Sequence, residues 1–477
     1  MPEESEIETI HAPLTGSNVS CTISPRFTCA LGGALATVWG IVGAIPIVHS
    51  SAGCSRNLYM GQCFGSGWQT YGHARGLMTP STSLVEKHVI FGGEGRLVQQ
   101  MKASFEITDA DVYFVLSGCQ VALIGDDIRT IVDQFKERSD QTIIMVETPG
   151  FKGNSYVGYD MVGKALVEQL VEPPNKNEAD KKELSVNLFG IVPAQDPFWQ
   201  GNINELKRLM NRLGVSVRWS GDYDTVDTIK KSSNADLNIV LSEYVGVPTA
   251  ELFKEKFGVP WIKYSLPIGS ETSKFIRKVG KELGIDSKLV EFVIDSEEEQ
   301  FLKQLDRIGH LYAGFNLQRD IGVIADSTYA IGLIKFLAND FGMNPTFVAV
   351  TDEPPIEIHD TIRKEILDLD YDLKPRIIIE SDGNKIWTAL EETRPNFLFA
   401  GSFDTKVAEN LDIPRLSVSY PITDRVILSR GYAGYRGSIT LIEDMVTILM
   451  KDMHLVINST LVKHGYKKST EQFAQVA

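Results

Sequence analysis

Short apolar runs alternate with amphipathic helical segments along most of the chain. The run Asp111–Ser117 is followed by the helical pattern Asp126–Arg138, and Thr142–Glu147 is the next apolar run. Runs of this length with helices between them predict parallel strands that are joined by crossover helices. Because helices cover both faces of a parallel sheet, the pattern predicts an α/β fold. The other predicted strands are Ile45–His49, Ser185–Val192, Val215–Trp219, Asn238–Ser242, Pro260–Tyr264, Arg319–Ala325, Thr346–Val350, Arg376–Glu380, Phe397–Ala400 and Arg415–Val418.

The length of 477 residues exceeds a single domain, which usually has roughly 100–200 residues. Glu172–Glu183 is polar and charged and holds two prolines, so it predicts a domain boundary. A second boundary is expected near Gly309–Gln318, after the charged helical region Asp295–Ile308. The chain therefore predicts three α/β domains with parallel sheets, at residues 1–178, 179–312 and 313–477, the last with a helical tail.

The net charge of −15 argues against a nucleic-acid partner, because binding to a phosphate backbone needs clustered lysines and arginines. The most apolar stretch, Ala30–Val48, contains four glycines and a proline, so we expect no membrane span. The first residues are acidic and lack the basic and apolar regions of a signal peptide. A cytoplasmic protein is the expectation.

All five cysteines lie in the first quarter of the chain. An odd number of cysteines argues against a disulfide framework, and the absence of a C-x-x-C pair argues against zinc-ribbon, thioredoxin and ferredoxin sites. Their clustering predicts thiolate ligands, although buried cysteines that only pack in a core remain an alternative. The five are Cys21, Cys29, Cys54, Cys63 and Cys119.

Three of these cysteines are expected in loops at one edge of the N-terminal sheet. Cys119 follows the strand Asp111–Ser117, Cys54 follows Ile45–His49, and Cys29 precedes a glycine-rich segment. Ligands of parallel sheets bind at the carboxyl ends of the strands, and the neighbouring glycines permit close approach of a bulky inorganic group. Three single cysteines from separate loops suit one half of a metal site that two subunits share.

Other polar residues of this region have simpler expected roles. His49 ends a strand and is expected to be a packed, hydrogen-bonding histidine, while Asp126 and Asp127 at a helix start are expected to be N-caps. The neighbours Asp424 and Arg425 suggest an ion pair or a partner contact. No Walker A motif is present, and no G-x-G-x-x-G follows a predicted strand, so the sequence does not predict a nucleotide site.

Several stretches of the chain together resemble component 1 of the nitrogenases. They are FTCALGGALATVWG, IPIVHSSAGC, HVIFGGEGRL, LSGCQVALIGDDI and ETPGFKGNSYVGYD, followed by NINELKRLMNRLG, GVPWIKYSLPIG, YPITDR and GYAGYRGS. Their order and separations resemble that family from about Pro25 to Leu449. An ordered set of motifs is far more specific than any one of them.

The resemblance implies an oxidoreductase subunit with three Rossmann-like domains in an α2β2 heterotetramer. It also implies an [8Fe–7S] P-cluster between an α-type and a β-type subunit, with three cysteine ligands from each. The matching positions here are Cys29, Cys54 and Cys119, whereas Cys21 and Cys63 match no ligand. A homodimeric, ATP-dependent reductase with a [4Fe–4S] cluster is the implied electron donor.

The resemblance also implies which subunit the chain is. The α-type subunit holds the catalytic cofactor with one cysteine in its middle domain and one histidine in its last domain. Ser242 stands at the cysteine position here, and Ser417–Pro421 contains no histidine. We therefore expect the β-type, electron-relay subunit, with no catalytic residue of its own.

Two departures from nitrogen-fixing β chains favour a nitrogenase-like relative. Gly150 stands in TPGF, where such chains often carry a serine that can bind the oxidised P-cluster, and the segment LYMGQCFGSGWQTYGHARGL also differs. Methylthio-alkane reductase, which cleaves C–S bonds of small thioethers, is the preferred activity. The alternatives are the β subunit of an iron- or vanadium-type nitrogenase, a non-catalytic scaffold for cofactor maturation, and a metal-free small-molecule-binding protein.

Overall fold

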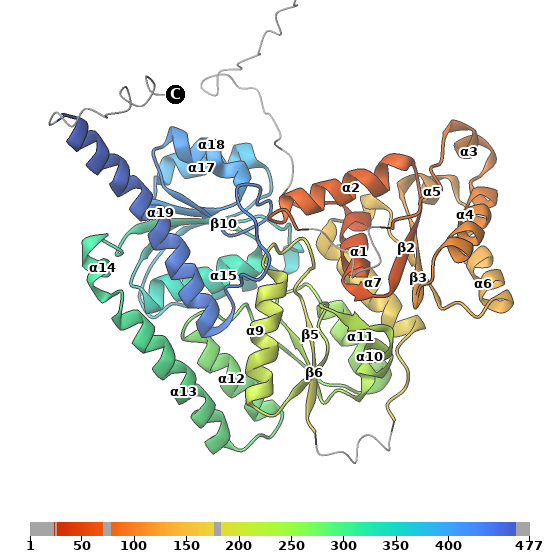
Figure 1. The fold of residues 1–477 in the computed structure, drawn as a ribbon, viewed down its shortest axis with the longest axis horizontal. Helices are drawn as coiled ribbons and strands as arrows, with labels where there is room; N and C mark the ends of the chain where they lie inside the picture. Colours follow the sequence, from red (N-terminus) through yellow and green to blue (C-terminus); the bar gives the residue numbers. More distant parts are fainter. Residues whose placement is uncertain (1–22, 24–25, 70–77, 176–182, 464–477) are drawn as a thin grey trace, which may run out of the picture.

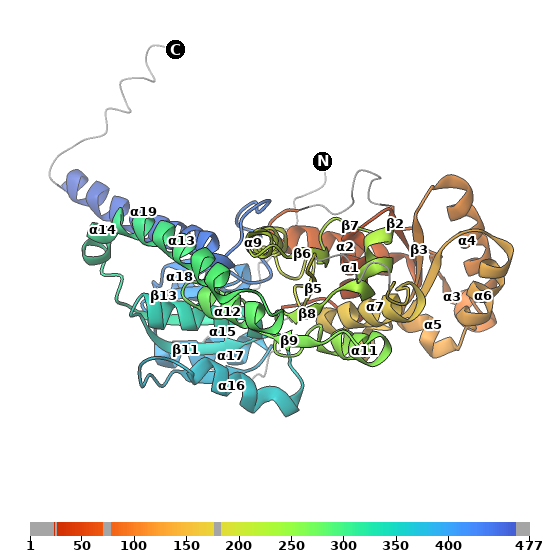
Figure 2. The same ribbon diagram turned by 90° about the horizontal axis from the view of Figure 1, so that it is seen from below.

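Three parallel sheets, each built from a consecutive part of the chain, form the core of the computed structural model (Figure 1). The structure describes residues 23, 26–69, 78–175 and 183–463. Seen from the side, the N-terminal sheet lies towards one end of the molecule, the middle sheet near its centre and the C-terminal sheet towards the other end (Figure 2). The predicted α/β class with parallel sheets is confirmed.

The N-terminal sheet has the order β2-β3-β4 and is covered on both faces. Alternate residues of β3 enter different clusters: Phe114 packs with α1 and α7, whereas Tyr113 packs with α4 and α6. Because both faces are buried, the strand is a continuous apolar run in the sequence. The elements are α1 (Ala30–Trp39), β1 (Ile41–Val42), β2 (Ala44–His49), α2 (Ala52–Gly65), α3 (Glu86–Phe91), α4 (Glu94–Ile107), β3 (Val112–Ser117), α5 (Cys119–Ile124), α6 (Ile128–Arg138), β4 (Ile143–Glu147), η1 (Gly150–Lys152) and α7 (Ser155–Gln169).

The middle sheet has the order β6-β5-β8-β9, so the strand order reverses at β5. A short parallel pair, β1 with β7, joins this region to the N-terminal part of the chain. The elements are β5 (Ser185–Phe189), α9 (Trp199–Arg212), β6 (Ser216–Trp219), β7 (Asp224–Thr225), α10 (Val226–Lys230), η2 (Lys231–Asn234), β8 (Leu237–Val240), α11 (Val247–Phe257), β9 (Trp261–Lys263), α12 (Glu271–Glu282), α13 (Ser287–Asp306) and α14 (Gly309–Gly314).

The C-terminal sheet has the order β12-β11-β10-β13-β14, with the reversal at β10. Its last helix, α19, packs along α9 and α13 of the middle region. The elements are β10 (Asp320–Ala325), α15 (Ser327–Lys335), η3 (Phe336–Asp340), β11 (Asn344–Val350), η4 (Ile356–Ile358), α16 (His359–Leu367), β12 (Arg376–Ile379), α17 (Gly383–Thr393), β13 (Phe397–Ala400), η5 (Ser402–Asp404), α18 (Thr405–Asn410), β14 (Arg415–Ser417) and α19 (Gly434–Lys463).

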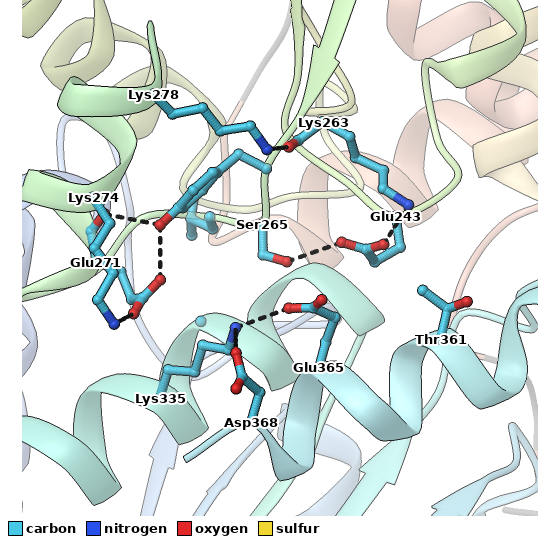
Figure 3. Close-up of a pocket in the computed structure, with 13 residues that line it drawn as sticks. Glu243, Lys263, Ser265, Glu271, Lys274, Lys278, Lys335, Thr361, Glu365 and Asp368 are labelled. Carbon is cyan, nitrogen blue, oxygen red and sulfur yellow. Dashed lines mark hydrogen bonds and ion pairs between the residues drawn. The ribbon is translucent and has the colours of Figure 1, made fainter. Parts of the chain in front are cut away.

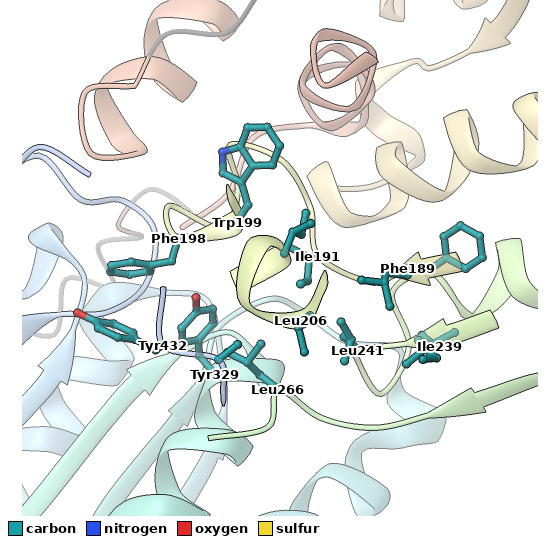
Figure 4. Packing of buried hydrophobic residues seen from close by; sticks show 14 of the residues in the cluster. Phe189, Ile191, Phe198, Trp199, Leu206, Ile239, Leu241, Leu266, Tyr329 and Tyr432 are labelled. Atoms are coloured by element: carbon teal, nitrogen blue, oxygen red, sulfur yellow. The ribbon is translucent and has the colours of Figure 1, made fainter. Parts of the chain in front are cut away.

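One large apolar cluster runs through all three sheets. Phe189 and Leu206 of the middle region belong to the same cluster as Tyr329 and Tyr432 of the C-terminal region (Figure 4). The predicted boundaries at 178/179 and 312/313 therefore separate sheets that share a core, and they remain predictions. The stretch Ala30–Val48 is divided into α1, β1 and β2. Among the helices of the described residues, none has the length and apolar character to cross a membrane.

Candidate functional site

The three predicted cysteine ligands lie at the N-termini of three helices. Cys29 is the N-cap of α1, Cys54 is the third residue of α2, and Cys119 is the first residue of α5. The expectation that they lie in loops is therefore wrong for Cys54 and Cys119, whereas Cys29 lies outside the helix that it precedes. None of these helices has a side-chain hydrogen bond from its N-cap, although Ser51 at the start of α2 is a usual N-cap residue. The free N–H groups and positive dipole end of a helix N-terminus favour a thiolate over a thiol.

Cys29 is held in place by backbone contact between α1 and α7. Its backbone forms an isolated antiparallel bridge with Asn154, the N-cap of α7. The two helices approach so closely at Gly33 that a Cβ atom there would lie 1.9 Å from the carbonyl oxygen of Ser155. Glycine is therefore needed at residue 33, and the position of Cys29 depends on backbone packing more than on its own side chain.

Cys54 and Cys119 follow neighbouring strands whose carboxyl ends are in contact. The N–H of Gly118 donates a hydrogen bond to the carbonyl oxygen of His49 over 2.9 Å. A Cβ atom at Gly118 would lie 2.1 Å from the Oγ of Ser50, so a larger residue could not occupy this position without a shift. The contact brings the segments that carry Cys54 and Cys119 together at one edge of the sheet.

Gly150 lies between two of the thiols. Its N–H donates a hydrogen bond to the Sγ of Cys119 over 3.0 Å. A Cβ atom at Gly150 would lie 3.2 Å from the Sγ of Cys119 and 3.2 Å from the Sγ of Cys29. The third thiol, Cys54, is within electrostatic range of Cys29, and its Sγ lies 3.5 Å from the Oγ of Ser51. The amide donor could not be predicted from the sequence, because every residue other than proline has a backbone N–H.

The burial and mutual proximity of the three thiols disfavour their ionised forms unless a cation is bound. Burial raises the pKa of the Cys29 thiol above its usual value, and the nearby Cys119 and Cys54 raise it further. The N–H groups of Gly32 and Leu31 act in the opposite direction. Because neighbouring thiolates repel one another, bound iron would stabilise their ionised forms.

The donor set fits a polynuclear cluster better than a single ion. All three cysteines are half-buried. Within the described residues, no three His, Cys, Asp or Glu side chains are arranged to hold one metal ion. The three thiols lie near one another but are not arranged around a single ion. Such an arrangement suits a cluster, because different iron atoms of a cluster bind different cysteines. The residues present therefore fit an iron–sulfur cluster. Cys63 is buried, and Cys21 lies outside the described residues.

Apolar side chains are exposed beside this edge. Ile90 and Phe91 at the end of α3 are 72% and 85% exposed, and Leu123 of α5 is 76% exposed. The helices α3 and α5 contact each other, and Phe151, next to Gly150, is also exposed. Exposed apolar groups of this size beside a half-buried site are typical of a surface that a partner covers.

The remaining polar candidates have structural roles. His49 is buried and hydrogen-bonded, as predicted, and Asp127 caps α6 by accepting from the N–H of Thr130. Asp126 is no N-cap, since its carboxylate bonds to His49 and Gly93.

Asp424 and Arg425 do not pair with each other, although they are neighbours in the sequence. Asp424 pairs with Arg415 over 2.6 Å. Arg425 pairs with Asp444 over 2.8 Å. Both charges therefore stabilise the C-terminal region.

The Ser242 side chain itself lies in a closely packed region. Ser242 is buried, and its Oγ accepts the N–H of Val245. The adjoining cavity measures about 20 Å³, which is room for about one water molecule. Its lining includes Tyr156 of α7 and Tyr329 of α15.

A larger cavity of about 470 Å³ lies between β9 and α12 on one side and α15 and α16 on the other (Figure 3). Ion pairs lie within each wall: Lys263 with Glu243 over 2.6 Å, and Lys335 with Glu365 over 2.8 Å. No cysteine lines it. It is therefore separate from the thiol site.

Three parallel sheets and a thiol-bearing edge on the first of them define an α/β protein with a candidate iron–sulfur site. The sequence profile of the nitrogenase component 1 type oxidoreductases matches residues 29–450, and the chain belongs to this family. The match includes all three half-buried cysteines of the site.

Relatives with different roles match this chain at similar sequence identity. The nitrogenase molybdenum-iron protein beta chain of Methanococcus maripaludis is 27% identical over 470 residues, covering 90% of this chain and 95% of that protein. The nitrogenase iron-molybdenum cofactor biosynthesis protein NifE of Rippkaea orientalis is 26% identical over 444 residues, covering 90% and 87%. The solved structure of nitrogenase Cp1 at pH 6.5 superposes with a TM-score of 0.77 at 20% identity, over 92% of this chain and 95% of that one.

Proposed function

We propose that this chain is the β-type, electron-relay subunit of a nitrogenase-like reductase. Cys29, Cys54 and Cys119 would hold one half of an [8Fe–7S] P-cluster, and an α-type partner in an α2β2 assembly would supply the other half. The observation that carries the proposal is the position of Gly150 between the thiols of Cys29 and Cys119. Relatives that are beta chains of nitrogenases support the β-type role.

The residues of this chain would hold and tune the cluster, which supplies one-electron transfer when it is bound. The thiolates would bind iron, and the N–H of Gly150 would stabilise the negative charge on the sulfur of Cys119. The helix N-termini at Cys29, Cys54 and Cys119 would add positive partial charge. Such donors stabilise the more negative, reduced state of the site and thereby shift its potential.

The exposed apolar groups beside the site support a partner surface. Ile90 and Phe91 of α3 lie on this surface together with Leu123 of α5. We assign it to the assembled complex: the α-type subunit would cover the open side of the thiol site, and a homodimeric, ATP-dependent [4Fe–4S] reductase would dock next to it. The described part of this chain would then contact no substrate, in line with the small cavity beside Ser242.

Reduction of small thioethers is the preferred activity of the complex. The support is the departure from nitrogen-fixing β chains at Gly150 and in the segment after Cys54. The reaction would take dimethyl sulfide, two electrons and two protons to methane and methanethiol. Co-expressed subunits with the reductase and ATP should release methane from dimethyl sulfide. Ammonia from dinitrogen without methane would instead favour a nitrogenase.

A maturation scaffold is the second candidate, because NifE proteins are similar to this chain at comparable identity. Anaerobic purification of the chain with its partner, followed by iron and sulfide analysis, tests the shared premise of a cluster. Turnover of an added substrate by that complex would support the reductase, and transfer of a cofactor precursor without turnover would support the scaffold. An iron-free, folded and active complex would overturn both.

A further inference from the structure

A buried histidine–aspartate pair lies behind the cysteine segments. The Nε2 of His49 lies 3.0 Å from the Oδ2 of Asp126, and the two side chains are 0% and 3% exposed. Because a carboxylate can only accept, the Nε2–H of His49 is the donor. On the other side of the ring, Nδ1 lies 3.1 Å from the Oγ1 of Thr82, which is also buried.

Asp126 also binds the start of α4. Its two carboxylate oxygens accept the N–H of Gly93 over 3.0 and 3.1 Å. A Cβ atom at Gly93 would lie 2.6 Å from Oδ2 of Asp126 and 3.1 Å from Cε1 of His49, so the contact requires glycine there. Two residues before Gly93 is the exposed Phe91, the last residue of α3.

The pair therefore connects three segments of the site. His49 ends β2, five residues before Cys54, and its carbonyl oxygen accepts the N–H of Gly118, directly before Cys119. Asp126 follows α5, the helix that Cys119 begins. The segment from Thr82 to Gly93 carries the apolar surface of α3 and is held from both ends by the same histidine–aspartate pair.

We propose that Asp126 is a positioning residue: through His49 and Gly93 it fixes the segments of Cys54 and Cys119 relative to each other and to α3. The inference rests on the proposed cluster function. Hydrogen bonds behind the ligands of a metal site orient those ligands, and loss of such an outer contact weakens metal retention. Asp126 touches no thiol, so it would act only through the two segments.

The test uses the co-purified complex and compares Asp126→Asn with Asp127→Asn. Asp127 is the neighbouring acid, but it is exposed and only caps α6, so it controls for charge and for local destabilisation. Iron loss to a ferrous chelator and the electron paramagnetic resonance spectrum of the cluster are measured. We expect iron loss to be roughly 10-fold faster in Asp126→Asn, with a changed spectrum, and unchanged in Asp127→Asn. Equal rates and spectra in the two variants overturn the inference.

A second pair of variants applies if Asp126→Asn does not accumulate. Gln at residue 49 keeps an N–H donor near the position of Nε2, whereas Leu does not. His49→Gln should retain iron and His49→Leu should lose it faster; equal loss in both variants overturns the inference. The iron content of the wild-type complex is a separate readout: an iron-free wild type overturns the proposed function itself.

Discussion

The N–H of Gly150 donates a hydrogen bond to the Sγ of Cys119 over 3.0 Å. Because residue 150 has no side chain, the space between Cys119 and Cys29 stays open, and the only group that it offers to the site is this N–H. A serine here would place a hydroxyl beside two thiols. The resemblance to nitrogenase β chains gives such a serine a role as an extra ligand of an oxidised cluster.

The first prediction concerns Gly150→Ser. The new Cβ would lie 3.1 Å from the Cβ of Cys29, so neighbours must move by a few tenths of an ångström, and the φ of Gly150 is not positive. We expect the variant to fold and, in the co-purified complex, to change the spectrum of the oxidised cluster. Redox titration followed by electron paramagnetic resonance checks this. Gly150→Ala adds the same Cβ without the hydroxyl, and a change common to both variants would contradict the prediction.

The central strands were predictable because they are buried on both faces. The run Phe397–Ala400 was predicted with the bounds that β13 has, and all four of its residues are buried. The pair of β1 and β7 was missed, since two residues are too few to show a period. The start of α1 at Ala30 was missed because its N-cap is a cysteine, and α5 was missed because six residues are too few to show a helical period.

The site was predictable as a set of cysteines but not as an arrangement. The count of thiols and the resemblance selected Cys29, Cys54 and Cys119, and their role as ligands remains a prediction. The amide donor at Gly150 could not be predicted from the sequence. The hydrogen bond between His49 and Asp126 could not be predicted either, because the two residues are 77 positions apart. Contacts between distant segments depend on how the sheet edges meet, and no local pattern encodes them.

The second prediction separates ligand cysteines from packing cysteines. Cys54 is half-buried and lies near the N-terminus of α2, whereas Cys63 near the other end of that helix is 4% exposed. Cys54→Ala should lose most of the iron of the complex with little loss of stability. Cys63→Ala should keep the iron and lower the free energy of unfolding by about 1 kcal/mol, through lost packing. Iron analysis and thermal unfolding check the pair, and iron loss from Cys63→Ala alone would contradict the assignment.

The third prediction concerns the ion pair between Arg26, three residues before Cys29, and Asp404 of the C-terminal region. Arg26 donates to both carboxylate oxygens of Asp404 over 2.5 and 2.7 Å, and both side chains are buried. Arg26→Ala leaves a buried carboxylate without its cation and should cost about 3–5 kcal/mol. Thermal unfolding should show a lower midpoint. The double variant with Asp404→Asn should recover part of the loss, and strictly additive losses would contradict this account.

The last prediction is a fall in stability as pH rises, caused by carboxylic acids at the interface of the middle and C-terminal sheets. Burial raises the pKa of Asp196 to about 6. Burial and the nearby charge of Asp352 raise the pKa of Asp326 to about 8. In the unfolded chain these groups ionise near pH 4. Between about pH 4 and pH 8 the folded state therefore binds more protons than the unfolded state, so the free energy of unfolding falls with rising pH.

Asp326→Asn tests the origin of this slope. Asp326 caps α15 by accepting the N–H of Tyr329, and asparagine is an equally good cap, so the helix should be preserved. An amide cannot ionise, so the variant lacks the contribution of this carboxyl to the slope between about pH 4 and pH 8. The midpoint of thermal unfolding should therefore fall less between pH 5 and pH 8 than in the wild type, because the variant no longer releases this proton. Asp372→Asn, an exposed substitution, should keep the wild-type slope, and equal slopes in all three proteins would show that Asp326 is not the source.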